Sequence, residues 1–412
     1  IVASVLALLA AQPLVPLHVL AGGMDGGSVK PGTNNNVAYG YAAYAGSDQS
    51  IAIGYRSKSS GTFFGGNIQP SIAIGAGSDA AGNNAIAMGT SAYNHASYSV
   101  ALGDTSKVLQ DYGIGIGFQS NVSGIHGIAI GEVTKAAKEG TIAMGSAARG
   151  YGNGGIALGY QALTGANVYT GAANNASPYN DNQSTINSYN KWGDAAIGLR
   201  ALATGGNATA LGRSASATAE NAIAIGGASA IDNTEKTEAS AAKATAIGYN
   251  ANASARDTLA LGTSSKASGS DALAIGKNAN ASNSDSIAIG QDTVSNNINS
   301  IALGNDSQSN GSSAIALGAH TKATDVGAVA LGLKAEATKE GSISIGQQSA
   351  ASGLKAITTG YQSAASGENA AAYGNTAKAV GKNSLALGAN TQATVEGGVA
   401  LGAGSIANTV AG

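Results

Sequence analysis

Residues that could perform catalysis or hold a metal ion are few in this sequence. The four histidines are His18, His95, His126 and His320. They are far apart in the sequence, and we expect each to lie in a solvent-facing turn. Acidic residues recur at equivalent places in a repeat, as in Lys138-Glu139-Gly140 and Lys339-Glu340-Gly341, which indicates solvated turn charges and not an acid–base pair. The sequence therefore predicts no catalytic residue, no metal site and no cofactor, and it is not expected to encode an enzyme.

The composition narrows the class of protein. The 412 residues include 61 glycines, five prolines and no cysteine, and 11% of them are charged. The glycines do not follow the strict Gly-X-Y order of collagen. A net charge of −2 gives no sign of a nucleic-acid-binding surface. A repeat protein rich in small residues is the class that this composition favours.

One glycine recurs every 14 residues without a slip from Gly248 to Gly402. The same spacing is found upstream at Gly40 and Gly54, from Gly75 to Gly159 and from Gly198 to Gly226, which makes 24 copies in all. A period this regular is the signature of one small unit stacked on itself. The sequence therefore predicts a rod-like solenoid and not a globular domain.

Each copy contains two segments with the side-chain alternation of a β-strand. The residue two before the glycine is Ala in 21 of the 24 copies, and it lies between aliphatic residues in most of them. Triplets such as Ile287-Ala288-Ile289 predict buried strands. After the glycine, small residues alternate with polar or long ones such as Lys322 and Glu336, which predicts a second strand with one face in solvent. Each coil is therefore expected to have two short strands and two turns.

The alternation within the triplets also predicts which side chains point inward. We expect the two large aliphatic residues to face the interior and the alanine between them to face outward. The predicted roll core then includes Ile287, Ile289, Ile301, Leu303, Ile315 and Leu317. The predicted outer seam, through which chains would associate, includes Ala274, Ala288, Ala302, Ala316 and Ala330. A stripe of this length exceeds the apolar surface that soluble monomers leave exposed, which predicts self-association.

An apolar segment precedes the repeat, and insertions interrupt it. Residues 1–22 are expected to be either the remnant of a signal peptide or an ordered cap. A membrane span is disfavoured, because Pro13 and Pro16 leave too short an uninterrupted apolar stretch. Residues 23–412 are expected to form the roll, with insertions near 55–70, 166–192 and 230–240. The longest insertion is predicted either to bind a partner or to brace a neighbouring chain. Its candidate binding residues are Tyr169, Tyr179, Tyr189 and Trp192.

Several hexapeptides carry a family resemblance. Asn299-Ser300-Ile301-Ala302-Leu303-Gly304 and Asp271-Ala272-Leu273-Ala274-Ile275-Gly276 closely resemble the head repeat of the trimeric autotransporter adhesins, the YadA-like family. The resemblance covers the chain from about Asn35 to Gly412. It implies an all-β fold, a left-handed parallel β-roll of about 24 fourteen-residue coils, assembled as a parallel homotrimer. It also implies display at a Gram-negative cell surface, anchored to the outer membrane through a region outside this sequence.

The expected function is binding. As an adhesin head, a rigid trimeric rod would attach the cell to host tissue, to other cells or to surfaces, in aggregation and biofilm formation. The expected partners are further copies of the chain and an extracellular matrix protein, glycan or surface, with no nucleic acid and no membrane contact. The alternative is a structural subunit of a self-assembling extracellular filament, which the apolar residues 1–21 and the lack of stalk heptads favour. An enzyme on a β-solenoid is disfavoured because the sequence lacks a pair of carboxylates placed for catalysis.

Overall fold

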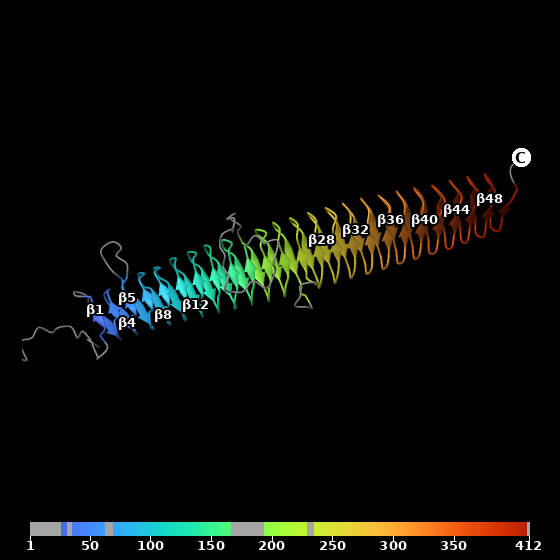
Figure 1. The fold of residues 1–412 in the computed structure, drawn as a ribbon. Helices are drawn as coiled ribbons and strands as arrows, with labels where there is room; N and C mark the ends of the chain where they lie inside the picture. Colours follow the sequence, from blue (N-terminus) through green and yellow to red (C-terminus); the bar gives the residue numbers. More distant parts are fainter. Residues whose placement is uncertain (1–25, 31–34, 62–68, 166–192, 229–234, 410–412) are drawn as a thin grey trace, which may run out of the picture. The chain divides into compact units, whose positions relative to one another are not determined.

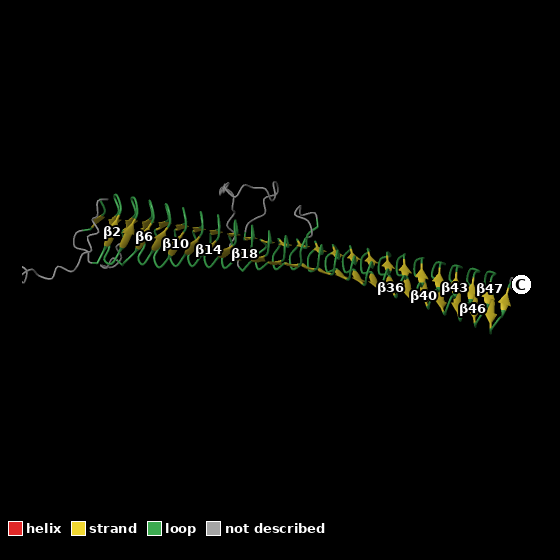
Figure 2. Ribbon diagram, turned by 90° about the horizontal axis from the view of Figure 1, so that it is seen from below, coloured by secondary structure: helices red, strands yellow, loops and turns green. Residues whose placement is uncertain are grey.

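The computed structural model describes residues 26–30, 35–61, 69–165, 193–228 and 235–409. These residues divide between two compact units, unit 1 (Ile1–Asn207) and unit 2 (Ala208–Gly412). In the described ranges every regular element is a short β-strand and none is a helix (Figure 2). The predicted all-β parallel solenoid of about 24 coils is confirmed. The same ranges therefore contain no helix that is long and apolar enough to cross a lipid bilayer.

Two kinds of strand alternate along unit 1. Three-residue strands form what we call its long-strand sheet: β2 (Val37–Tyr39), β4 (Ile51–Ile53), β6 (Ile72–Ile74), β8 (Ile86–Met88), β10 (Val100–Leu102), β12 (Ile114–Ile116), β14 (Ile128–Ile130), β16 (Ile142–Met144), β18 (Ile156–Leu158) and β20 (Ala195–Ile197). Two-residue strands form its short-strand sheet: β1 (Ser28–Val29), β3 (Tyr44–Ala45), β5 (Lys58–Ser59), β7 (Asp79–Ala80), β9 (Tyr93–Asn94), β11 (Lys107–Val108), β13 (Asn121–Val122), β15 (Lys135–Ala136), β17 (Arg149–Gly150), β19 (Leu163–Thr164) and β21 (Leu202–Ala203).

Unit 2 repeats the same alternation. Its long-strand sheet contains β22 (Thr209–Leu211), β24 (Ile223–Ile225), β26 (Thr245–Ile247), β28 (Leu259–Leu261), β30 (Leu273–Ile275), β32 (Ile287–Ile289), β34 (Ile301–Leu303), β36 (Ile315–Leu317), β38 (Val329–Leu331), β40 (Ile343–Ile345), β42 (Ile357–Thr359), β44 (Ala371–Tyr373), β46 (Leu385–Leu387) and β48 (Val399–Leu401). Its short-strand sheet contains β23 (Ser216–Ala217), β25 (Glu238–Ala239), β27 (Asn252–Ala253), β29 (Lys266–Ala267), β31 (Asn280–Ala281), β33 (Val294–Ser295), β35 (Gln308–Ser309), β37 (Lys322–Ala323), β39 (Glu336–Ala337), β41 (Ala350–Ala351), β43 (Ala364–Ala365), β45 (Lys378–Ala379), β47 (Gln392–Ala393) and β49 (Ile406–Ala407).

Parallel pairing between successive coils holds each unit together. In unit 2, β32 pairs with β34 in register, so that Ala288 lies beside Ala302. The backbone N–H of Ile287 donates to the Ser300 carbonyl at 2.9 Å. Residues 14 apart therefore occupy the same place in neighbouring coils, which produces the ordered succession of strands from β28 to β48 in Figure 1. A single 14-residue coil would leave the backbone N–H and C=O groups of its strands without partners, because in parallel pairing these groups bond to the strands of the neighbouring coils.

The repeat glycine turns the chain between the two sheets. Gly290 has φ +135°, a conformation that residues with a Cβ rarely adopt. A Cβ added to Gly290 would lie 2.4 Å from the carbonyl oxygen of Gly304 in the next coil. Two residues later Asp292 adopts a left-handed φ of 55°, and the second turn of the coil has Asp285 at 56°. Asp and Asn tolerate this region better than most residues, which accounts for their frequency in both turns.

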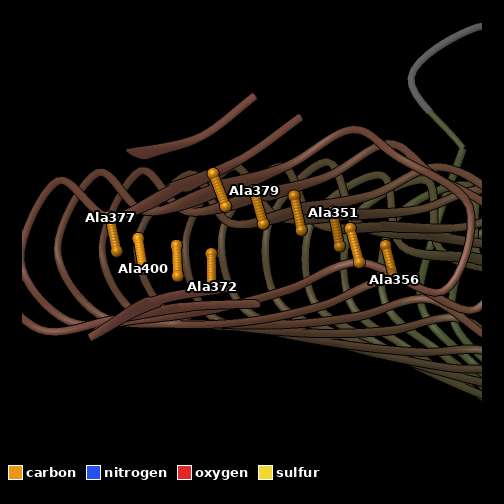
Figure 3. Close-up of a cluster of buried hydrophobic side chains, with 10 residues drawn as sticks. Ala351, Ala356, Ala372, Ala377, Ala379 and Ala400 are labelled. Carbon is orange, nitrogen blue, oxygen red and sulfur yellow. The ribbon is translucent and has the colours of Figure 1, made fainter. Parts of the chain in front are cut away.

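Small side chains fill the interior of most coils, and the larger Asn94, Val108 and Val122 are buried in unit 1. In the coil that ends at Gly290, the inward residues Ala279, Ala281, Ser286 and Ala288 are all fully buried. Figure 3 shows the equivalent alanines farther along unit 2 lying between the two walls of the coil, with Ala351 and Ala372 among them. Serine and threonine occupy some inward positions, and many of their hydroxyl groups form hydrogen bonds inside the coil. The Oγ atoms of Ser295 and Ser300, for example, are 2.6 Å apart across one coil.

The predicted inward and outward directions of the triplets were wrong. The predicted seam alanines Ala274, Ala288, Ala302, Ala316 and Ala330 are fully buried inside the coils. The predicted core residues Ile287, Ile289, Ile301, Leu303, Ile315 and Leu317 point outward and are half-buried or exposed. The physical reason is that the two sheets lie close together, with small residues at most inward positions of both. A methyl or hydroxyl group fits between them, whereas a branched side chain such as that of Val108 is accommodated where glycines such as Gly113 and Gly115 face it.

Enlarging one inward alanine should destabilise the solenoid. We expect Ala288→Leu to lower the free energy of unfolding by roughly 1–3 kcal/mol, because extra methylene groups in a filled interior force the backbone apart. The matched control is Ala350→Leu, which places the same side chain outward from β41, where Ala350 is partly exposed. We expect the control to stay within about 0.5 kcal/mol of the wild type in urea denaturation. Equal losses for the two variants would contradict the inward direction of Ala288.

Candidate interaction surfaces

The outer side of the long-strand sheet in unit 2 is an apolar face. Leu303 is 39% exposed and Leu331 is also 39% exposed, although both are aliphatic. The residues that alternate with the buried alanines continue this face from β22 to β48. Its aliphatic members are Leu211, Ile223, Ile225, Ile247, Leu259, Leu261, Leu273, Ile275, Ile287, Ile289, Ile301, Leu303, Ile315, Leu317, Val329, Leu331, Ile343, Ile345, Ile357, Leu385, Leu387, Val399 and Leu401.

Unit 1 has an equivalent apolar face on its own long-strand sheet. Ile51 and Ile53 flank the buried Ala52, and both are half-buried. Met88 and Met144 replace the second aliphatic residue in β8 and β16, and each is 40% exposed. The same outward direction of large apolar side chains is therefore present in both units.

The outer side of the short-strand sheet is polar. Lys322 and Glu336 lie at equivalent positions of β37 and β39, and their Nζ and Oε1 atoms are 3.4 Å apart. Both side chains are about half exposed, so this ion pair contributes little to stability. The prediction that small residues of this strand face the interior and polar or long ones face solvent is confirmed. The two outer sides of the coil therefore differ in chemistry, with one apolar and the other charged.

Position-by-position sizes in the sequence contain a signal that would have revealed the apolar face. The residue four before each repeat glycine is small as well, as at Ala272, Ser286 and Ser300. It shares a strand face with the alanine two before the glycine, since side chains alternate. One face of the strand therefore carries two small residues, and the other face carries two large ones. Only the face with small residues fits against the small residues of the opposite strand, so that face lies inside the coil.

The described histidines lie at the surface, and the described acidic residues, among which Asp194 is buried, do not converge with them on one site. His126 and His320 are in exposed turns, as predicted, whereas His95 directly follows β9. His95 Nε2 lies 3.0 Å from Asp79 Oδ2, and its Nδ1 lies 2.7 Å from the Tyr93 hydroxyl. His320 Nδ1 lies 3.0 Å from Asp306 Oδ2. Within the described part of the chain, no three His, Asp or Glu side chains form a group that could hold a metal ion.

One carboxylate of the turns has a shifted acidity. The Asn278 amide donates a hydrogen bond of 2.7 Å to Asp292 Oδ1. This bond, with a further one from Gln291, holds the pKa of Asp292 below its ordinary value because it favours the charged form. Asn278 and Asp292 occupy equivalent positions in neighbouring coils. The shift therefore arises from the side-chain ladder along the turns and marks no catalytic group.

Exposed aromatic side chains gather at the turns of unit 1, which sequence reasoning did not place. Tyr41 and Tyr55 stack with ring centroids 5.7 Å apart. Tyr98, Tyr112 and His126 form a second column at the other turn of the coil. Sixteen of the 19 aromatic residues lie at or before Trp192. The one sequence signal for stacking is the spacing of 14 residues within each stacked group.

The predicted partner-binding residues belong to the longest insertion. Tyr169, Tyr179, Tyr189 and Trp192 lie outside the described residues, as do residues 1–22. Their proposed roles therefore stay predictions. The candidate surfaces of the described chain are the apolar face, the polar face and the aromatic turns.

Comparison with known proteins links this geometry to one family. The family model described as "YadA head domain repeat (2 copies)" matches repeatedly, at residues 37–63, 69–92, 111–132, 123–148, 203–229, 239–265, 267–293, 295–321, 309–335, 323–349, 337–357 and 379–405. These matches cover more than half of the chain, and they fall on the coils that carry the buried alanine and the outward aliphatic residues. A search of curated proteins found no match.

Proposed function

Because the chain belongs to the YadA head domain family, we propose that it is the adhesive head of a homotrimeric protein on the bacterial surface. In this proposal the head binds a partner outside the cell and performs no catalysis. It attaches the cell to host tissue, to other cells or to a surface, and so promotes aggregation and biofilm formation. The head is extracellular, and the protein is anchored to the outer membrane by a region beyond the repeats.

The observation that carries the proposal is the apolar face. Aliphatic side chains such as Leu303, Ile315 and Leu317 lie outward on coil after coil of one sheet. Soluble monomers rarely expose contiguous apolar patches larger than a few hundred Å². Burial of this face against the same face of further copies would remove it from water, with roughly 25 cal/mol gained per Å² of apolar surface covered. In a closed cyclic assembly every copy can bury the same apolar face against the other copies.

Self-association would leave the polar face and the turns for a partner. Lys322 and Glu336 on the polar face keep that side soluble, and their charges oppose close packing of copies there. The turns carry the exposed aromatic and polar side chains that are enriched in recognition surfaces. The proposed division of labour therefore assigns assembly to the long-strand sheet and recognition to the turns.

Two measurements test the proposal together. Native mass spectrometry of the folded chain is expected to give three copies, and beads coated with the protein are expected to adhere to cells or matrix-coated surfaces. Beads coated with heat-unfolded protein are the control for nonspecific stickiness. A folded monomer would contradict the trimeric head, and adhesion equal to the unfolded control would contradict the adhesive role.

A further inference from the structure

A column of stacked aromatic rings lies along one edge of unit 1. Tyr98, Tyr112 and His126 occupy the same turn position in three successive coils, just before β10, β12 and β14. The Tyr98 and Tyr112 rings have centroids 5.4 Å apart and planes 7° apart. The Tyr112 and His126 rings have centroids 4.9 Å apart and planes 12° apart. All three side chains are exposed, so the column lies at the surface.

The backbone fixes the spacing of this column. The three residues adopt left-handed φ values of 55°, 61° and 57°. The N–H of Tyr112 donates to the Ser97 carbonyl at 2.9 Å, and the N–H of His126 donates to the Asp111 carbonyl at 3.1 Å. Identical turns joined by identical hydrogen bonds therefore hold the rings parallel. A ring added at the next position would continue the stack with the same geometry.

The next two coils place glycine at that position. Gly140 and Gly154 have left-handed φ values of 64° and 63°, so their backbone matches that of the aromatic residues. A Cβ at Gly140 would come no closer than 3.8 Å to another heavy atom, and one at Gly154 would meet nothing within 4 Å. We call these two residues the glycine shelf. The column of rings thus ends at His126, and the next two positions along it carry no side chain.

Polar side chains accompany the glycine shelf. Glu139 directly precedes Gly140 and is exposed, and Asn153 directly precedes Gly154 and is partly exposed. A carboxylate and an amide can accept and donate the paired hydrogen bonds that neighbouring hydroxyl groups require. The face of an aromatic ring is electron-rich and attracts the positively polarised C–H groups of a flat partner. An apolar aromatic side chain could not form hydrogen bonds with the carboxylate and the amide.

We propose that the glycine shelf is a carbohydrate-binding site, in which a pyranose ring of a glycan stacks on His126 as the next member of the column. The C–H face of the sugar contacts the imidazole ring, and its hydroxyl groups bond to Glu139 and Asn153. The inference rests on the proposed adhesive function, for which it supplies a class of ligand. A trimer would carry three such sites, which raises the avidity for a surface coated with glycans.

Variants of the glycine shelf and the ring test this site. The probes are methyl β-glucoside, methyl β-galactoside and methyl N-acetyl-β-glucosaminide, each titrated into the assembled protein and followed by saturation-transfer NMR. We expect at least one of them to bind. Gly140→Asn fills the shelf with a side chain that tolerates the left-handed backbone, and it should weaken binding at least about tenfold. His126→Ala should do the same, whereas His126→Phe keeps a ring and should retain binding.

The matched control is Gly327→Asn in unit 2. Gly327 has φ 63° and nothing within 4 Å of an added Cβ, so the backbone cost of the substitution is the same. We expect this variant to bind sugar like the wild type, and thermal unfolding verifies that all variants fold. Absence of sugar binding by the wild type, or unchanged binding by Gly140→Asn, would overturn the site. Bead adhesion in the same samples separates the two proposals, because adhesion without sugar binding contradicts only the site, whereas sugar binding without adhesion contradicts only the adhesive function.

Discussion

Leu303→Lys is expected to convert the assembled protein into separate chains. Leu303 points outward from β34 in the middle of the apolar face. In an assembly that covers this face, the lysine would be an unpaired buried charge in every copy, at a cost of roughly 3–5 kcal/mol each. Native mass spectrometry and light scattering should therefore report a shift from the trimer toward the monomer at low micromolar concentration.

The control for this variant introduces the same lysine on the other side of the coil. Gln308→Lys places it outward from β35 on the polar face, beside the solvent-exposed Lys322. We expect Gln308→Lys to leave the oligomeric state unchanged, since the polar face stays in solvent. If Gln308→Lys dissociated the assembly and Leu303→Lys left it intact, the interface would lie on the short-strand sheet, which would contradict the proposed assembly.

Gly290→Ala is expected to open the coils on either side of it. The substitution combines a backbone conformation that is unfavourable for alanine with a Cβ placed against the carbonyl of Gly304. Together these effects should cost about 3 kcal/mol or more. Because a repeat protein opens locally, hydrogen exchange is the suitable measurement. We expect faster exchange of the amides that pair β32 with its neighbours β30 and β34.

Gly327→Ala provides the comparison for the glycine effect. Gly327 lies in the second turn of its coil, where φ is 63° and an added Cβ meets open space. Only the cost of a left-handed alanine applies there, about 1–2 kcal/mol. Exchange near Gly327 should therefore rise less than exchange near Gly290. Equal effects at the two glycines would show that the close approach of Gly304 contributes nothing.

Most of the fold could be predicted from the spacing of residues. The glycine period determined the number of coils, and the triplets before each glycine located the strands of the long-strand sheet. The alternation at Lys322 and Glu336 indicated the solvent side of the other sheet. These inferences succeed because coil stacking repeats the same local structure, so that each position is seen many times in one sequence.

The direction of the triplets could not be predicted from hydrophobicity alone. Ile287-Ala288-Ile289 is apolar on both sides, so the rule that large apolar residues face the core selects the wrong side. Packing decides the direction, because the interior between two closely spaced sheets accepts Ala288 and excludes its neighbours. The apolar face then requires a partner, which explains why both sides of the strand are hydrophobic.

The aromatic column could be recognised only from the geometry of the coils. Tyr98, Tyr112 and His126 are 14 residues apart, yet nothing in that spacing shows that the residues share a left-handed turn at the surface. The glycine shelf has even less signal in the sequence, since Gly140 and Gly154 are two glycines among 61. Their position at the end of the column distinguishes them from the other turn glycines.

Single-cysteine cross-linking tests the central claim most directly, that the aliphatic residues of the long-strand sheet face other copies while the alanines face inward. The chain has no cysteine of its own, so each variant reports one position. Leu303→Cys is expected to form covalent links between copies under mild oxidation. Ala302→Cys should stay unreactive until the protein unfolds, and Gln308→Cys should react with a soluble maleimide without linking copies. Cross-linking through Ala302→Cys, with Leu303→Cys left unlinked, would contradict the account.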